Sequence, residues 1–130
     1  MTILSVSNNL LANSYFSEGK KLFDNNNLKK SKFNFERDIV FNPKSEKSYL
    51  YLAKIFKKEK NDILEKNNLQ TVLLLNPKNE EAIYLLALLN IKESNFSQAK
   101  DLIENIKSIC VKLCSKESEL KEKLNNSKTK

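Results

Sequence analysis

Two cysteines, Cys110 and Cys114, are the residues best suited to chemistry in this 130-residue chain. Four residues apart on a predicted helix, they would share one helix face. They would then form half of a thiolate metal site or a redox pair, or they are two small apolar residues packed with Ile106 and Leu113. We favour packing, because the sequence has no second cysteine pair and no histidine to complete a site. A site shared between two copies is the remaining alternative.

The sequence lacks the residues that common active sites require. It contains no histidine, which excludes a Ser/His or Cys/His nucleophile and a His-containing metal site. Gly19 is its only glycine, so it has neither a P-loop nor a dinucleotide-binding fingerprint. The acidic pair Glu80 and Glu81 stands at a predicted helix start, where negative charge meets the helix dipole favourably. We therefore predict that the protein is not an enzyme and has no catalytic residues, metal or cofactor.

Composition favours a single all-α domain. One glycine and two prolines are too few for the turns of an all-β fold, and 40% hydrophobic residues suffice for a core. The net charge of +7 indicates an acidic partner or lysine-rich solvated faces. We favour solvated faces over nucleic-acid binding, since Arg37 is the only arginine and base readout favours arginine.

The N-terminal segment predicts a cytoplasmic protein. Residues 1–7 carry no charged region followed by an apolar run, so they do not resemble a signal peptide. No stretch approaches the roughly 20 apolar residues that span a membrane. A longer exported parent protein is the alternative.

Two Asn-Pro-Lys triplets, at residues 42–44 and 76–78, lie 34 residues apart. Each ends a helical pattern, because the residue before proline is disfavoured in the α region. The first predicted helix can be N-capped by Ser7, Asn8 or Asn9. The helices that follow the two triplets can be N-capped by Ser45 and Asn79, respectively. The last helical pattern has no proline, so it either continues to about Leu124 or breaks near Ser115 into a separate capping helix.

A 34-residue helix-turn-helix period resembles the tetratricopeptide repeat family. The resemblance implies three repeats at residues 12–45, 46–79 and 80–112, with a helix start at 1–11 and a capping or extended helix at 113–130. It also implies an all-α fold, with the repeats stacked as a short right-handed α-solenoid.

Several positions agree with the family pattern, and a few depart from it. The first helices carry small residues at Gly19, Ala53 and Ala87, and the second helices carry large ones at Phe35, Leu69 and Ile103. Small residues let two helices approach closely enough for the large residues to interlock. Asn90 stands where a large residue is usual, and Asp38 and Glu65 where small ones are usual, so repeat two is expected to pack with a shifted second helix.

The family resemblance implies a concave groove that binds a protein segment with apolar anchors and acidic residues. The residues predicted to bind the partner are Phe16, Lys20, Phe23, Leu50, Lys54, Lys57, Tyr84, Leu88 and Ile91. We therefore predict a scaffold, adaptor or chaperone-like module for protein–protein interaction. The alternatives are a self-assembly module that pairs through the third repeat and last helix, and a lysine-mediated binder of nucleic acid or an anionic surface.

Residues 82–89 are apolar on every side, so a helix there must be buried on more than one face. Either the C-terminal helix folds back over it, or a partner or second copy covers it.

Some adaptors of this family bind the C-terminal tail of a chaperone. They do so through five positions, which together hold Lys and Asn residues and an Arg. Here those positions hold Phe16, Lys20, Tyr51, Glu81 and Leu85. None matches, so we predict that the protein does not bind such tails in that mode.

Overall fold

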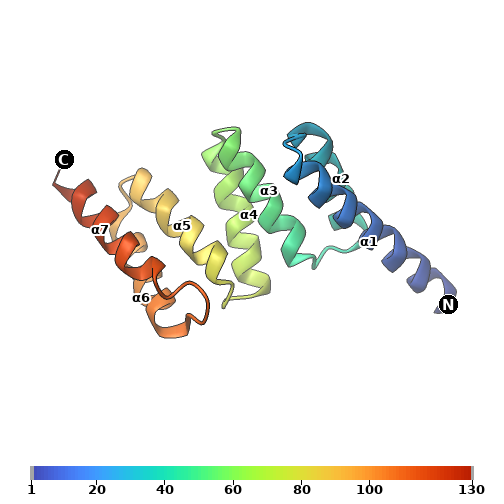
Figure 1. Ribbon diagram of the computed structural model, residues 1–130. Helices are drawn as coiled ribbons and strands as arrows, with labels where there is room; N and C mark the ends of the chain where they lie inside the picture. The colour runs from blue at the N-terminus through green and yellow to red at the C-terminus, as the bar shows by residue number, and fades with distance from the viewer. Residues whose placement is uncertain (1, 130) are drawn as a thin grey trace. The chain divides into compact units, whose positions relative to one another are not determined.

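The computed structural model describes residues 2–129 and, from residue 13 onward, their side chains. Apart from short connections the described part of the chain is helical, which confirms the all-α class (Figure 1). The helices are α1 (Thr2–Asp24), α2 (Leu28–Phe41), α3 (Glu46–Lys58), α4 (Asp62–Leu75), α5 (Glu80–Lys92), α6 (Phe96–Ile109) and α7 (Lys116–Lys128).

The chain forms two compact units that divide inside α4, between Asn68 and Leu69. Unit 1 holds α1, α2, α3 and the first half of α4, and unit 2 holds the second half of α4 with α5, α6 and α7.

The 34-residue period appears directly in the backbone. Asn26, Lys60 and Ser94 are each 34 residues apart, and each adopts the left-handed conformation, with φ of 59°, 58° and 63°. At the next residue, the N–H groups of Asn27, Asn61 and Asn95 donate to a carbonyl five residues earlier, at 2.8, 2.9 and 2.8 Å. This is the Schellman closure of a helix, and it turns the chain from the first helix of each repeat into the second.

The connections between repeats lie where the prolines predict them. α2 ends at Phe41 and α4 at Leu75, directly before the two Asn-Pro pairs. Asn79 caps α5 as predicted, its side chain accepting the N–H of Ala82 at 2.9 Å. Ser45 holds the N-cap position of α3, but the prediction that its side chain caps the helix is wrong. Its hydroxyl instead donates to the side-chain oxygen of Asp38 at 2.6 Å.

α1 begins earlier than the sequence predicts. It starts at Thr2, so the predicted helix start after Ser7, Asn8 or Asn9 is wrong. Serine and asparagine cost only a few tenths of a kcal/mol, roughly, inside a helix, and no Gly or Pro interrupts residues 2–18. The side chains of these three cap candidates lie outside the described residues.

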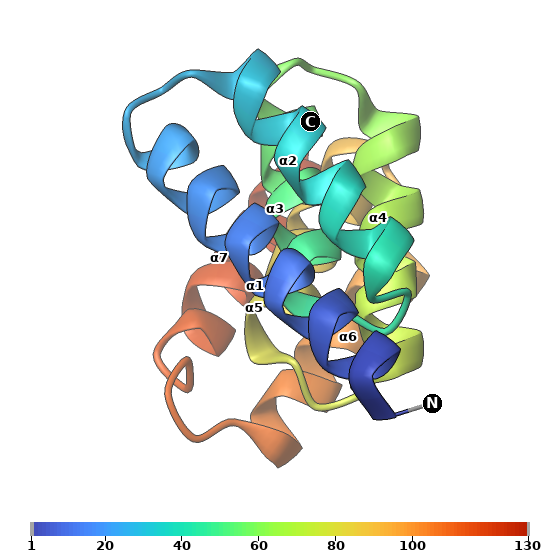
Figure 2. The same cartoon turned by 90° about the vertical axis from the view of Figure 1, so that its right-hand side faces the viewer.

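In unit 1, α1 and α2 form an antiparallel pair and lie side by side in both views (Figures 1 and 2). A Cβ atom placed on Gly19 would lie 2.9 Å from the ring of Phe35, so only glycine fits without a shift. Ser31 donates its hydroxyl to the Gly19 carbonyl at 2.7 Å across the same contact. Phe35 is fully buried and joins Leu52, Ile55 and Phe56 in the core of this unit.

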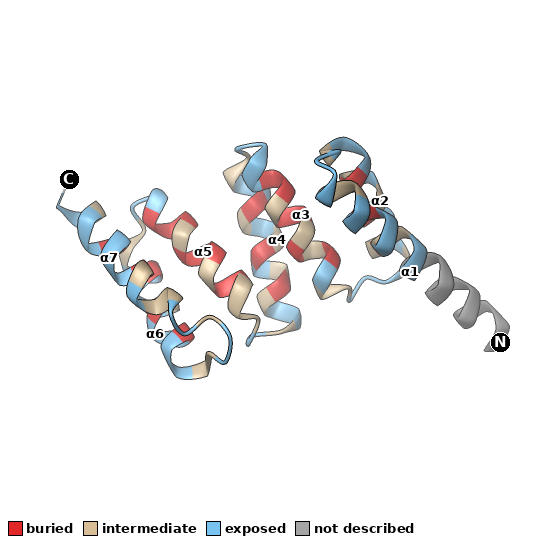
Figure 3. Ribbon diagram, viewed as in Figure 1, coloured by how far each residue is buried: buried red, intermediate tan, exposed pale blue. Residues whose placement is uncertain are grey.

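In unit 2, the last helical pattern is broken rather than continuous, because α6 ends at Ile109 and α7 begins at Lys116. Eight of the thirteen residues of α5 are buried, as its all-round apolar pattern predicts (Figure 3). Leu120 and Leu124 of α7 lie in one core cluster with Ile83, Ala87 and Ile103. The C-terminal helix therefore folds back and covers part of α5.

The buried carboxylate of Asp38 accounts for one departure from the family pattern. It accepts hydrogen bonds from Ser45 and from the fully buried Ser48, so its charge is satisfied inside the protein. The corresponding positions 34 residues later hold Val72, Asn79 and Ala82, of which Val72 and Ala82 are fully buried. A polar set in repeat one is thus exchanged for a largely apolar set in repeat two. The shifted second helix of repeat two remains a prediction.

We predict that Asp38→Ala lowers the free energy of unfolding by about 1–3 kcal/mol, because the Ser48 hydroxyl is left buried without its acceptor. The double variant Asp38→Val/Ser48→Ala, which installs the apolar residues of repeat two, should recover most of that loss. Urea unfolding followed by circular dichroism measures both. A double variant as unstable as Asp38→Ala would show that the hydrogen bonds are not the reason for the loss.

We also predict that Lys60→Gly raises the free energy of unfolding by up to about 1 kcal/mol, because glycine adopts positive φ without a Cβ clash. Asn26→Gly at the equivalent turn should have a smaller effect, since asparagine tolerates this conformation. Thermal unfolding of both variants tests this ranking, and an equal or reversed ranking would contradict it.

Candidate functional site

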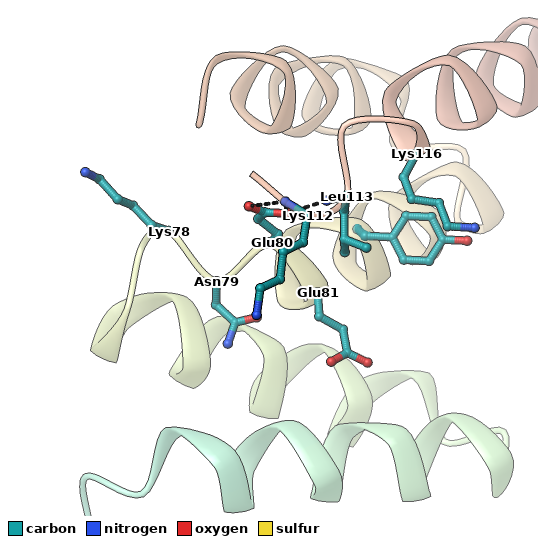
Figure 4. A pocket seen from close by; sticks show the side chains of 8 residues that line it. Lys78, Asn79, Glu80, Glu81, Lys112, Leu113 and Lys116 are labelled. Carbon is teal, nitrogen blue, oxygen red and sulfur yellow. Dashed lines mark hydrogen bonds between the residues drawn. The ribbon is translucent and has the colours of Figure 1, made fainter. Parts of the chain in front are cut away.

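A pocket of about 630 Å³ opens in unit 2 between the start of α5 and the connection from α6 to α7 (Figure 4). Its lining combines three lysines and two carboxylates with an aromatic and an aliphatic side chain. The lining residues are Lys78, Asn79, Glu80, Glu81, Tyr84, Lys112, Leu113 and Lys116. The pocket can thus offer both charge and apolar surface to a ligand.

Glu80 closes one side of this pocket by binding the α6–α7 connection. Its carboxylate accepts three successive backbone N–H groups: those of Val111, Lys112 (3.0 Å) and Leu113 (2.6 Å). Successive N–H groups that converge on one anion form a backbone nest. Here the anion is the protein's own carboxylate, so Glu80 does more than meet the helix dipole, the role that the sequence indicates.

These contacts set the protonation of Glu80. Removal of water from around the carboxyl group would by itself raise its pKa, but the hydrogen bonds from Val111, Leu113 and Lys112 outweigh that effect. The pKa of Glu80 is therefore lowered from its ordinary value of 4.5, and the carboxylate stays ionised at neutral pH.

Tyr84 lies at the centre of a second polar contact, made with α7. Its hydroxyl donates to Glu119 at 2.8 Å, and the same carboxylate accepts from Lys116 at 2.8 Å. The Lys116 ammonium group also lies 5.2 Å from the centre of the Tyr84 ring. Removal from water, and then the bond to Glu119, raise the pKa of Tyr84, while Lys116 and then Tyr84 lower the pKa of Glu119. The tyrosine thus remains a neutral donor, and Glu119 remains ionised at neutral pH.

The packing prediction is confirmed for Cys110, which packs against the core cluster that contains Ile106, but it is wrong for Cys114, which is exposed. Cys110 and Cys114 form a disulfide in the connection between α6 and α7. They do not lie on one helix face, because α6 has ended at Ile109. Both predicted alternatives, a continuous last helix and a break near Ser115, placed Cys110 and Cys114 within a helix. The helix instead ends before Cys110, and the two sulfur atoms meet in the connection. The disulfide agrees with the alternative of a redox pair, which stays a prediction.

In unit 1, an aromatic cluster with nearby lysines lies on α1 and α3. Tyr51 contacts Phe16, Phe23 and Phe35, with ring centroids 5.9, 5.2 and 5.0 Å away. Phe16, Phe23 and Tyr51 are half-buried, so part of each ring is open to solvent. The ammonium groups of Lys54 and Lys58 lie 4.9 Å above the Tyr51 and Phe23 rings respectively. We call this surface, made of Phe16, Phe23, Tyr51, Lys54 and Lys58, the aromatic–lysine surface.

The predicted partner-binding residues differ in their accessibility. Lys20 and Lys57 are exposed, and Lys20 forms a 3.6 Å ion pair with Asp24. Tyr84 and Leu88 are half-buried against the core cluster of unit 2. Leu50 and Ile91 are only 8% and 7% exposed, so they serve mainly as core residues.

Sequence reasoning missed Tyr51, Lys58, Lys116 and Glu119. Tyr51 lies three residues before Lys54 and Lys58 four residues after it, so the helical spacing from this predicted groove residue could have included them. Nothing in the sequence indicated that Glu119 would meet Tyr84, because that contact depends on the break before α7.

Solved structures of two TPR domains are similar to this chain over most of its length. The C-terminal TPR-containing domain of an FK506-binding protein from Plasmodium falciparum matches with a TM-score of 0.76 and 17% identity, over 97% of this chain and 96% of that one. The Sgt2 TPR domain from Aspergillus fumigatus matches with a TM-score of 0.69 and 15% identity, over 91% of this chain and 77% of that one. The fold is that of a tetratricopeptide repeat domain.

The tetratricopeptide repeat fold confirms the resemblance seen in the sequence. No protein-family model matches the chain, and the search of curated proteins found no match. At 15–17% identity the likeness to solved structures establishes the fold alone. Within the described residues no helix is both long and apolar enough to span a membrane. The same residues contain no group of three or more His, Cys, Asp or Glu side chains placed to hold a metal ion.

We predict that Glu80→Gln lowers the melting temperature at pH 7, because the three N–H groups lose an ionised acceptor. A lowered pKa means that this stabilisation is complete above about pH 4.5 and is lost as the pH falls through the pKa of folded Glu80. The difference in melting temperature between wild type and variant should therefore shrink below pH 4.5.

The control is Glu122→Gln, which removes an exposed carboxylate of α7. Melting curves between pH 3 and pH 7 measure both variants, and a pH-independent difference for Glu80→Gln would contradict the assignment.

Proposed function

We propose that the protein is a non-enzymatic protein–protein interaction module. It binds a partner segment that carries apolar or aromatic anchors together with acidic residues. The aromatic–lysine surface of unit 1 is the observation that carries the proposal. It combines rings partly open to solvent with ammonium groups directly above them, on the first helices of the repeats.

The composition of this surface suits recognition rather than stability alone. Aromatic rings are enriched where proteins bind partners, because a large rigid ring contributes much contact area and loses little side-chain entropy. Exposed lysines attract an acidic segment at a distance, which raises the association rate. The exposed Lys20 and Lys57, together with the half-buried Lys54, would supply that attraction in unit 1.

Unit 2 would contribute a second contact region. Tyr84 lines the 630 Å³ pocket and keeps part of its surface exposed. Leu88, on the same helix, is also partly exposed. Lys112 and Lys116 line that pocket and would receive an acidic side chain of the partner. The low exposure of Leu50 and Ile91 suggests that they support these contacts from beneath.

The partner can be sought by retention on the immobilised protein from a native lysate. We predict that Lys54→Glu/Lys57→Glu loses a protein that wild type retains, because the charge attracting its acidic residues is reversed. The matched control is Lys29→Glu/Lys30→Glu, an equal charge change on exposed positions of α2, and it should retain that protein. Circular dichroism confirms that both variants remain helical.

Other outcomes would refute the proposal in distinct ways. Equal retention by all three proteins would mean that the aromatic–lysine surface is not the binding site. Retention of nucleic acid alone, released by moderate salt, would favour lysine-mediated nucleic-acid binding, whose affinity falls steeply with salt. A mass that rises with concentration, without any retained protein, would favour self-assembly.

A further inference from the structure

The two cysteines of the chain both lie in the short connection that precedes the last helix. The disulfide between them encloses residues 111–113, the same residues whose N–H groups bind Glu80. Cys114 is exposed and Cys110 is half-buried, so a dissolved thiol can reach the bond. The disulfide is therefore both accessible and placed at a structural junction.

The connection between α6 and α7 leads into a helix that is otherwise held by few contacts. α7 begins two residues after Cys114 and contributes only Leu120 and Leu124 as buried residues. Its polar contacts with α5 include the hydrogen bond from Tyr84 to Glu119 and the Lys116 ammonium group against the Tyr84 ring. Leu113, inside the disulfide loop, packs against the same core cluster. The loop thus adds the Glu80 hydrogen bonds and the Leu113 contact to a helix that is weakly anchored by itself.

We propose that Cys110–Cys114 is a reversible thiol–disulfide exchange site whose redox state sets how firmly α7 is held against α5 and α6. The closed loop restricts residues 111–113 to conformations in which their N–H groups converge. Opening the loop restores backbone freedom, so the three groups must be ordered at an entropic cost before they can bind Glu80. α7 then detaches more often, while the α5–α6 pair keeps its own core.

The exchange requires a dithiol as reductant. One thiolate of the dithiol attacks the exposed sulfur of Cys114, the disulfide bond breaks, and Cys110 leaves as a thiolate and takes up a proton. The second thiol of the dithiol then attacks the mixed disulfide, releasing Cys114 as a thiol and closing the dithiol into its own disulfide. Two electrons and two protons pass to the protein. A small-molecule disulfide, acting as the oxidant, reverses the process.

Hydrogen–deuterium exchange of the full chain, with and without dithiothreitol, tests the proposal. We expect amide exchange in residues 111–128 to rise about tenfold on reduction, with little change in the core of α6, because only the junction opens. Mass spectrometry should show the gain of two hydrogen atoms, and oxidised glutathione should restore both the mass and the slow exchange.

Two variants sharpen this experiment. Cys110→Ser/Cys114→Ser should exchange like the reduced protein and should not respond to dithiothreitol. Oxidised Glu80→Gln should show part of the rise, and its reduction should add less than reduction adds to wild type, since both changes act on the same hydrogen bonds.

The proposal would be overturned by equal exchange in the oxidised and reduced proteins. It would equally be overturned if dithiothreitol failed to reduce the folded protein, or if reduction unfolded α5 and α6 together with α7.

Discussion

The contact between the two helices of a repeat depends on how little side chain stands between them. At Gly19 not even a methyl group fits without a shift, because the ring of Phe35 occupies the space. The equivalent positions of the later repeats hold alanines that are fully buried. Close approach lets large residues of the second helices, such as Phe35 and Ile103, become buried, and their burial provides much of the stabilisation. The turn geometry at Asn26, Lys60 and Ser94 only has to bring the chain back to this contact.

The sequence predicted the features of the fold that repeat. These features are the 34-residue period, the helix ends before the prolines, and the alternation of small and large positions. Each of them, like the burial of α5 on all sides, was predicted from several residues that agree. Features that occur once were predicted less well. The early start of α1, the bond of Ser45 to Asp38 and the disulfide each depend on a single local competition between alternative structures. A periodic pattern carries no information about such a competition.

The candidate site shows the same division. Family positions put Phe16 and Phe23 among the predicted partner-binding residues, and in the structure both half-buried rings contact Tyr51, with Lys58 above the Phe23 ring. They could not indicate that Leu50 and Ile91 would be almost fully buried, since exposure depends on neighbouring helices as well as on helix face. Nor could they reveal the Glu80 hydrogen bonds, because backbone N–H groups have no signature in the sequence. Charged residues whose partners are backbone groups are therefore the ones that pattern reasoning misassigns.

The polar set of Asp38, Ser45 and Ser48 also bears on how the chain avoids assembling out of register. Near-identical repeats risk pairing with the wrong neighbour during folding, since each helix offers a similar apolar face to several others. A buried carboxylate tolerates few alternative partners, because without its two hydroxyl donors it would remain uncompensated in the interior. At the same position repeat two carries Val72, which cannot replace Asp38 as an acceptor. The polar set thus distinguishes the connection after the first repeat from the equivalent connection after the second, where Val72 and Ala82 take the places of Asp38 and Ser48.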